Sequence, residues 1–277
     1  MWQLQRLLST VLDKGEPGTN LGRPGGKELG RKGAMWYWLF KYVLLGPMLW
    51  LLGRPKIEGV EHIPSDGPAI LASNHQAVLD SFFFPLRVRR RITFLAKSEY
   101  FTGRGLKGAF QRWFFSVVGQ VPIDRTGADA AKDALDAGLR VLSQGKLLGI
   151  YPEGTRSPDG RLYKGKTGMA RLALESGVKV IPVAMIGTAK VNPIGSKMWR
   201  PAKVTIRVGE PIDFSRFEGM GGNRFVERAV TDEVMYKLMR LSGQEYVDIY
   251  AATLRNPAPE TGQSVNDVTR LPDTRAG

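Results

Sequence analysis

The sequence predicts an α/β domain, built on a mostly parallel central sheet with flanking helices and preceded by a membrane-associated helical segment. Two observations lead to this fold class. From Lys56 onward, short apolar runs alternate with longer stretches of helical periodicity, as in a parallel sheet covered by helices. Ahead of this alternation, residues 35–52 form an apolar run rich in tryptophan and tyrosine, which prefer the membrane–water interface.

Six short apolar runs, each bounded by turn-forming or polar residues, are expected to form the strands of the sheet. They are Ala69–Ala72, Ile92–Ala96, Gln120–Ile123, Leu147–Tyr151, Lys179–Ile186 and Val204–Val208. Helical periodicity predicts five helices between and after these strands. They are Val78–Val88, Leu106–Val117, Asp129–Gln144, Thr167–Ser176 and Phe225–Leu241.

Composition divides the chain into four parts. Residues 1–34 are expected to be a disordered, basic extension, because residues 15–33 are rich in glycine, proline and charge. No secretory signal peptide is expected there. Residues 35–53 form the membrane-associated segment and residues 54–250 the α/β domain. Residues 251–277 are expected to be a disordered tail, because most of them are polar.

The segment Met35–Leu52 is long enough for a marginal membrane-spanning helix and contains one charged residue, Lys41. Gly46 and Pro47 interrupt its middle, and proline breaks or kinks a helix. Basic residues flank the segment on both sides, as expected for contact with anionic headgroups. We therefore expect a bent helix pair that lies in one leaflet, and we favour this over a spanning helix or a buried hairpin.

The chain is strongly basic and contains no cysteine. Its 40 Lys and Arg exceed its 26 Asp and Glu, which gives a formal net charge of +14. Such a charge attracts anionic lipids, nucleic acid, and phosphorylated or acidic substrates. No zinc-finger spacing, RNA-recognition signature or leucine zipper occurs, so nucleic acid is not an expected partner. The lack of cysteine excludes disulfides, thiolate nucleophiles and cysteine-based zinc sites.

A histidine and an aspartate, His75 and Asp80, lie five positions apart just after the first predicted strand. At a strand-to-helix turn, this spacing lets the two side chains converge. A carboxylate beside an imidazole fixes its tautomer and stabilises the imidazolium, so the other ring nitrogen can act as a general base. The alternative is that Asp80 only caps a helix.

Charged residues also follow two other predicted strands. Arg156 lies in a turn with Glu153 and Gly154, and Arg125 comes just after another strand. Arginine suits bidentate recognition of a phosphate, and glycine lets the backbone approach a ligand. Because ligands bind at the carboxyl edge of open α/β sheets, we expect these residues to share a site with His75. Taken singly, each is also consistent with a surface turn.

Two further features are not expected to carry chemistry. The stretch Gly160–Thr167 matches the phosphate-binding loop pattern literally, but residues 152–159 separate it from the preceding strand. We therefore do not expect a nucleoside triphosphatase. His62 lies in a turn-rich segment and is expected at the surface. With two histidines in the chain, no histidine-rich metal site is expected.

Four sequence blocks, in this order along the chain, resemble those of the 1-acylglycerol-3-phosphate O-acyltransferase family. They are Asn74–Asp80 with its His-x₄-Asp spacing, Gly119–Arg125, Glu153–Ser157 and Val180–Val183. The resemblance covers about residues 56–241. The second block departs from the family pattern at Pro122, where an aromatic residue is common.

The resemblance implies a role for each candidate residue. His75 would be the base and Asp80 its orienting partner. Arg125 and Arg156 would bind the phosphate of the acceptor, and Lys97, after the second predicted strand, is a weaker candidate for the same role. The turn residues that would bind substrate or shape that pocket are Glu153, Gly154 and Thr155.

The resemblance also implies a reaction. An acyl group would pass from acyl-CoA or acyl carrier protein to the sn-2 hydroxyl of lysophosphatidate, giving phosphatidate, without a metal or bound cofactor. The enzyme would be held on membrane lipids at the cytoplasmic face. One alternative keeps this chemistry on glycerol 3-phosphate or another lysolipid. An alternative of a different class is a basic nucleotide- or nucleic-acid-binding protein.

Overall fold

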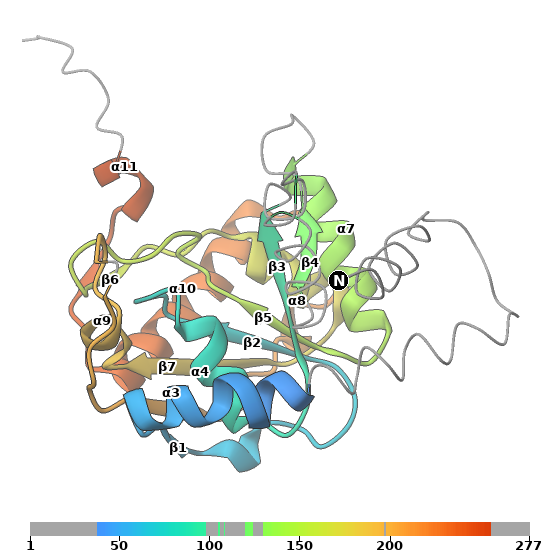
Figure 1. The fold of residues 1–277 in the computed structure, drawn as a ribbon. Helices are drawn as coiled ribbons and strands as arrows, with labels where there is room; N and C mark the ends of the chain where they lie inside the picture. The colour runs from blue at the N-terminus through green and yellow to red at the C-terminus, as the bar shows by residue number, and fades with distance from the viewer. Residues whose placement is uncertain are drawn as a thin grey trace, which may run out of the picture.

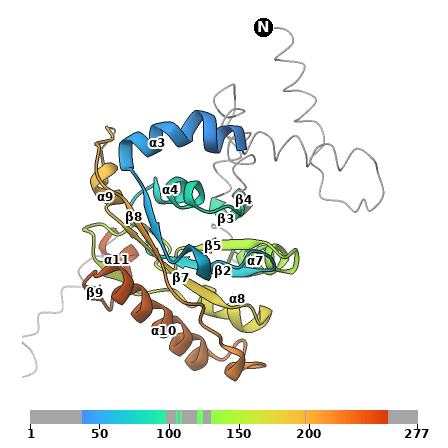
Figure 2. The same cartoon turned by 90° about the horizontal axis from the view of Figure 1, so that it is seen from below.

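The computed structural model describes residues 38–97, 105, 108, 120–123, 130–196 and 198–255. In this part of the chain, a mostly parallel seven-stranded sheet lies between two layers of helices (Figures 1 and 2). Helices α3 and α4 cover one face of the sheet, and α8 and α10 cover the other. The predicted α/β fold class is therefore confirmed.

All six predicted strands are present, with ends that differ by a residue or so. The sheet has the order β1-β8-β7-β2-β5-β3-β4 and is parallel except where β7 meets β8. Its strands are β1 (Lys56–Glu58), β2 (Ala69–Ser73), β3 (Ile92–Lys97), β4 (Gln120–Ile123), β5 (Leu147–Ile150), β7 (Val180–Ile186) and β8 (Thr205–Val208). A separate parallel pair joins β6 (Leu162–Tyr163) to β9 (Tyr246–Val247).

Four of the five predicted helices are observed at or near their expected positions, and the fifth, Leu106–Val117, falls almost entirely outside the described residues. The observed four are α4 (Asp80–Arg87), α7 (Ala130–Ser143), α8 (Gly168–Ser176) and α10 (Arg224–Ser242). The shorter elements are η1 (Phe40–Leu44), α3 (Leu45–Gly53), η2 (Val60–His62), α9 (Thr188–Val191), η3 (Ser215–Phe217) and α11 (Ala251–Arg255).

The central strand β2 is buried on both faces and separates two apolar cores. Because side chains alternate along a strand, Ile70 and Ala72 pack with α7, α8 and α10, whereas Ala69 and Leu71 pack with α3 and α4. Each fully buried leucine or isoleucine of this kind contributes about 1.5–3 kcal/mol. The two cores hold β2, and therefore the turn that follows it, in a fixed position.

The N-terminal helix corrects the expected break at Gly46 and Pro47. The π-helical turn η1 continues directly into α3, so the described part of the segment is one helix and not a bent pair. A side chain at Gly46 would meet the carbonyl oxygen of Lys41 at 2.0 Å, so glycine permits the wide turn. Pro47 follows this π-turn closely, so the widened backbone accommodates the proline within a continuous helix.

One side of this helix packs on the domain. Leu49 is buried, and a side chain at Gly53 would collide with Phe83 of α4 at 2.5 Å. The single charge of the segment, Lys41, also points inward and donates a hydrogen bond to the carbonyl of Val88, the residue that follows α4. Burial lowers the pKa of Lys41 to about 8. Within the described residues, no helix combines the length and apolar character needed to span a bilayer.

The expected boundary of the C-terminal tail is also corrected. Residues 251–255, which were assigned to a disordered tail, form α11, and Ala251 is fully buried. The apolar side chain of Ala251 provides the reason, because its burial anchors this short helix to the domain.

Candidate active site

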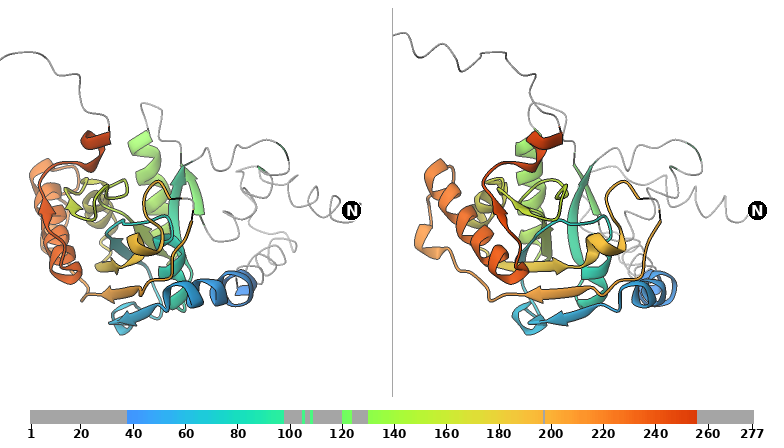
Figure 3. Two further views of the ribbon diagram at one scale, coloured as in Figure 1. Left: turned by 60° about the vertical axis from the view of Figure 1, so that its left-hand side comes forward. Right: turned by 90° about the vertical axis from the view of Figure 1, so that its left-hand side faces the viewer.

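The candidate site lies at the carboxyl edge of the sheet, where β2 and β5 end side by side. These strands are parallel neighbours in register, with Ala72 opposite Ile150. The turn after β2 carries His75, and the turn after β5 carries Glu153 and Arg156. This edge lies at the left of Figure 1 and faces the viewer in the right-hand view of Figure 3. The topology therefore brings the first and third sequence blocks together.

His75 and Asp80 form the pair that their spacing predicts. The Nδ1 atom of His75 lies 2.9 Å from Oδ2 of Asp80. The aspartate side chain is completely buried, and that of His75 is 17 % exposed. The arrangement arises locally, because β2 ends before Asn74 and α4 begins at Asp80, which leaves a short connection that folds the two side chains toward each other.

The contacts of Asp80 determine which nitrogen of the imidazole is available. Its Oδ2 atom also accepts the backbone N–H groups of Gln76 at 2.7 Å and Ala77 at 2.8 Å. These two donors and the imidazole converge on one carboxylate oxygen, which lies at the N-terminus of α4 and acts as an acceptor for all three. It therefore accepts the Nδ1–H of His75, and the lone pair of Nε2 can accept a proton. Asp80 is thus more than a helix cap.

The carboxylate of Glu153 joins the two turns. Its Oε2 accepts the backbone N–H of His75 at 3.0 Å, and its Oε1 accepts that of Tyr163 at 2.9 Å. The backbone N–H of Ser157 donates to the carbonyl of His75 at 2.8 Å. The backbone of His75 is therefore held on both sides by the Glu153–Ser157 turn. In this arrangement Glu153 shapes the site through the backbone.

The turn itself requires glycine at position 154. Gly154 has a φ of 71°, in the left-handed region that glycine adopts without strain. The stem of Lys166 lies against it, because a side chain at Gly154 would meet Lys166 Cε at 3.1 Å. The backbone N–H of Lys166 in turn donates to the carbonyl of Pro152 at 2.8 Å. This places a lysine over the turn that contains Thr155 and Arg156.

The other candidate phosphate-binding residues are placed only in part. Arg156 is half-buried and directly precedes Ser157, whose N–H binds the His75 carbonyl. Lys97 is the last residue of β3, one strand beyond β5 at the same edge of the sheet. Arg125 lies outside the described residues. The structure thus puts Arg156 beside His75 and Lys97 at the same edge.

Two residues of this site were missed by the sequence analysis. Asn74 is fully buried, exchanges two hydrogen bonds with the backbone of Met185 in β7, and donates to Gln244 at 2.6 Å. Tyr151 stacks on the His75 ring, with 3.9 Å between ring centroids. Asn74 is the first residue of the first recognised block, and Tyr151 lies two residues before the third, which was the available signal.

The phosphate-loop pattern at Gly160–Thr167 does not form such a loop. Its middle is β6, which pairs with β9, so its backbone N–H groups do not form a cradle after a parallel strand. In the part of the chain that is described, no three acidic or histidine side chains group together as a metal site. His62 is half-buried, and its Nδ1 lies 3.1 Å from the carbonyl oxygen of Val208.

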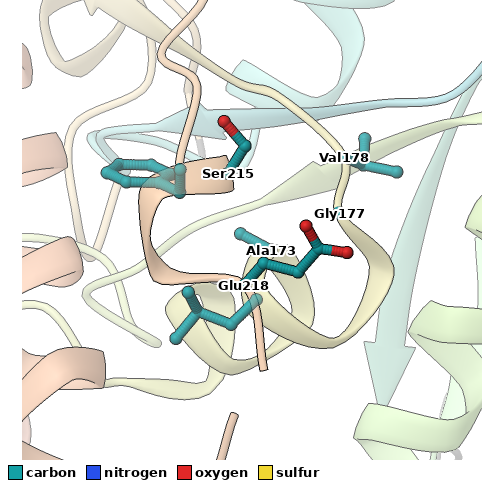
Figure 4. Close-up of a pocket in the computed structure, with 7 residues that line it drawn as sticks. Ala173, Gly177, Val178, Ser215 and Glu218 are labelled. Carbon is teal, nitrogen blue, oxygen red and sulfur yellow. The ribbon is translucent and has the colours of Figure 1, made fainter. Parts of the chain in front are cut away.

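A surface pocket lies at the opposite edge of the sheet. Ser215 and Glu218 face the end of α8 there, near Gly177 and Val178, which precede β7 (Figure 4). The amino end of β7 is remote from the carboxyl ends that carry His75 and Glu153. The pocket is therefore not part of the candidate site.

Glu153 gives a prediction about stability. Burial raises its pKa from an ordinary value of 4.5 to about 7, although two backbone N–H donors oppose this shift. The folded protein therefore binds this proton more tightly than the unfolded chain does. Its contribution to stability is complete below pH 4.5 and is lost as the pH rises through about 7.

Glu153→Gln should remove this pH dependence. We compare the free energy of unfolding of the native protein with that of Glu153→Gln. Relative to the variant, the native protein should lose on the order of 1–3 kcal/mol of stability between pH 4.5 and pH 8. Urea titrations at several pH values measure this difference, with Glu210→Gln at an exposed glutamate as the control. A difference that is constant with pH would contradict the raised pKa.

Comparisons with known proteins agree with this geometry. A family model described as acyltransferase matches residues 54–186. The chain is 35% identical over 162 residues to the chloroplastic 1-acyl-sn-glycerol-3-phosphate acyltransferase LPAT1 of Arabidopsis thaliana. The aligned residues make up 58% of this chain and 44% of that relative. It is 31% identical over 183 residues to the 1-acyl-sn-glycerol-3-phosphate acyltransferase of Limnanthes douglasii, covering 63% and 60%. The chain thus spans about half the length of these relatives.

A solved structure of an acyltransferase is also similar to this chain. The crystal structure of the 1-acyl-sn-glycerophosphate acyltransferase PlsC from Thermotoga maritima is similar with a TM-score of 0.52 and 26% identity. The similarity covers 76% of this chain and 88% of that one. The family match begins just before β1 and ends with β7, so it contains the whole His75–Asp80 and Glu153–Ser157 arrangement. Residues 54–186 are thus similar in sequence to the acyltransferase family.

Proposed function

We propose that this protein transfers a fatty acyl group from acyl-CoA or acyl carrier protein to the sn-2 hydroxyl of 1-acylglycerol-3-phosphate, giving phosphatidate. The observation that carries the proposal is the His75–Asp80 pair, because its oriented imidazole is suited to take a proton from a hydroxyl. The names of the relatives support the choice of acceptor.

The proposed reaction is a direct transfer. Nε2 of His75 takes the proton of the sn-2 hydroxyl as its oxygen attacks the thioester carbonyl. The tetrahedral intermediate then collapses, the carbon–sulfur bond breaks, and the leaving sulfur takes the proton from the imidazolium to give a free thiol. Asp80 stabilises the imidazolium while it exists, because its buried carboxylate already accepts the Nδ1–H.

Basic side chains at the same edge would bind the acceptor phosphate. Arg156 is the best placed of them, since the following residue is hydrogen-bonded to His75. Lys97 ends β3, Arg125 comes two residues after the neighbouring strand β4 in the sequence, and both would add positive charge there. A phosphate held two carbons from the reacting hydroxyl would bring that hydroxyl to the base, which is the positioning effect that intramolecular reactions exploit.

The protein would work at a membrane surface, where its lipid acceptor lies. The outward side of the N-terminal helix exposes Tyr42, Val43, Trp50 and Leu51, with Leu51 69% exposed. The only charge within residues 38–53, on Lys41, is turned toward α4. This leaves an uncharged aromatic and aliphatic face that suits insertion into one leaflet.

A second apolar segment lies beside the end of this helix. The loop after α9 exposes Ile194, Met198 and Trp199. The chain that follows it pairs with the end of α3, where the N–H of Ala202 donates to the carbonyl of Leu52 at 3.1 Å. The two apolar surfaces are therefore neighbours and would contact the same membrane.

Replacement of His75 tests the reaction. In His75→Ala, acyl transfer should fall by at least about 10²–10⁴-fold, the usual effect of losing a positioned base. Thiol release from acyl-CoA in the presence of lysophosphatidate, glycerol 3-phosphate and other lysolipids measures both activity and acceptor choice. His62→Gln, at the other histidine, is the control and should retain activity. Near-normal turnover in folded His75→Ala would refute the mechanism.

Replacement of the arginines tests phosphate recognition. Arg156→Lys and Arg125→Lys should each raise KM for the phosphate-bearing acceptor more than KM for the thioester, since lysine cannot reproduce the planar guanidinium fork. Initial rates with each substrate varied in turn separate the two effects. If both KM values rise equally, these arginines serve the fold or the donor instead.

The exposed face of α3 gives a prediction about membrane binding. Trp50→Asp combined with Leu51→Asp should weaken binding to vesicles that contain anionic phosphatidylglycerol by about tenfold or more, because two apolar side chains lose their burial in lipid. Co-sedimentation measures binding, and Val60→Asp, at an exposed valine of η2, is the control. Unchanged binding would contradict the proposed face. Protease protection of one terminus in sealed vesicles would indicate a spanning segment instead.

A further inference from the structure

A stack of three rings leads from the sheet to His75. The ring of Tyr151, just past the end of β5, lies 3.9 Å from that of His75 between centroids, with 12° between the planes. Phe94 of β3 stacks on Tyr151 at 5.7 Å and 15°. Gly149 makes room for this stack, because a side chain there would meet the Phe94 ring at 2.4 Å. One face of the imidazole is therefore covered by a phenol ring.

The hydroxyl of Tyr151 ties the stack to the helix that carries Asp80. It lies 2.8 Å from Oγ of Ser81, the residue that follows Asp80 in α4. Burial and the nearby charge of Asp80 raise the pKa of Tyr151 well above its usual value, so the hydroxyl stays neutral. One side chain thus contacts the imidazole through its ring and the aspartate's helix through its hydroxyl.

We propose that Tyr151 is a positioning residue for the base, acting through the ring stack on His75 and the hydrogen bond to Ser81. This inference rests on the proposed function and adds a residue to it. The stack prevents the imidazole from rotating away from the plane in which Nδ1 meets Asp80 and Nε2 meets the acceptor. The π face of the phenol also stabilises the imidazolium that forms during transfer. The hydroxyl ties Tyr151, and with it the ring that covers His75, to the helix that carries Asp80.

Simple packing would leave these features unexplained. A residue that only filled space at position 151 would need neither a hydroxyl nor a ring parallel to the imidazole. The hydroxyl forms a hydrogen bond with the side chain of Ser81, next to Asp80. Removing either hydroxyl removes this hydrogen bond. The two contacts therefore predict two separable effects, one from the hydroxyl and one from the ring.

The hydroxyl is tested by a double-mutant cycle. Tyr151→Phe and Ser81→Ala should each lower kcat by about three- to tenfold, with little change in either KM. The double variant should lose no more than either single variant, because all three lack the same bond. Tyr246→Phe, which removes the hydroxyl of a half-buried tyrosine in β9, is the control and should keep kcat. Additive losses in the double variant would overturn the hydroxyl part of the proposal.

The ring is tested by Tyr151→Leu, which keeps an apolar cover over the imidazole but removes its π face. We expect kcat to fall by about tenfold or more and the pKa of His75 to fall by about 0.5–1 unit, because the imidazolium loses its cation–π contact. Since the chain has two histidines, NMR titration of the imidazole signals is simple, and His62→Gln assigns them. Tyr246→Leu is the matched control.

The NMR titration does not depend on catalysis, so the two proposals can fail separately. If the native protein transfers no acyl group, the proposed function is wrong, whatever the titration shows. If the native protein is active but Tyr151→Leu leaves both kcat and the His75 pKa unchanged, Tyr151 is only a packing residue. If Tyr151→Leu does not fold, the cycle with Tyr151→Phe and Ser81→Ala decides the question.

Discussion

The buried carboxylate of Glu153 is the contact on which the candidate site depends. It bridges the backbone of His75 after β2 to that of Tyr163 in β6, so that two turns from different parts of the chain become one surface. Without it, two buried N–H groups would lose their partner, which costs about 1–3 kcal/mol for each group left unsatisfied. Such a carboxylate is costly to bury, as the raised pKa of Glu153 shows. The site is therefore held together by a residue that weakens the fold at neutral pH.

Asp80 is a second buried carboxylate, and its hydrogen bonds are arranged differently from those of Glu153. Three N–H donors converge on one of its oxygens, and the N-terminus of α4 supplies a favourable dipole. The difference matters because Asp80 contacts the imidazole of His75 directly, whereas Glu153 contacts the backbone of His75. Two carboxylates at one sheet edge thus have different contacts with His75, one with its backbone and one with its imidazole.

The sequence predicted what depends on local pattern and missed what depends on tertiary contact. The strands were found because each is a short apolar run, and the His75–Asp80 pair because its spacing fits one turn. The strand β1 was missed because it has one apolar residue, Ile57, in three. The break expected at Pro47 did not form, because a π-turn accommodates it. The stack of Tyr151 joins residues 76 positions apart in the chain, which no periodicity reveals.

Helix α4 connects these features mechanically. Its first residue, Asp80, contacts the imidazole of His75, and Lys41 from the N-terminal helix donates to the carbonyl of Val88 just past its last turn. A cation at the C-terminus of a helix complements the helix dipole, as the aspartate does at the other end. The apolar face that would meet the membrane is on the same helix as Lys41. In the proposed membrane-bound state, this eight-residue helix would therefore link the membrane-facing helix to His75, with a charged contact at each end.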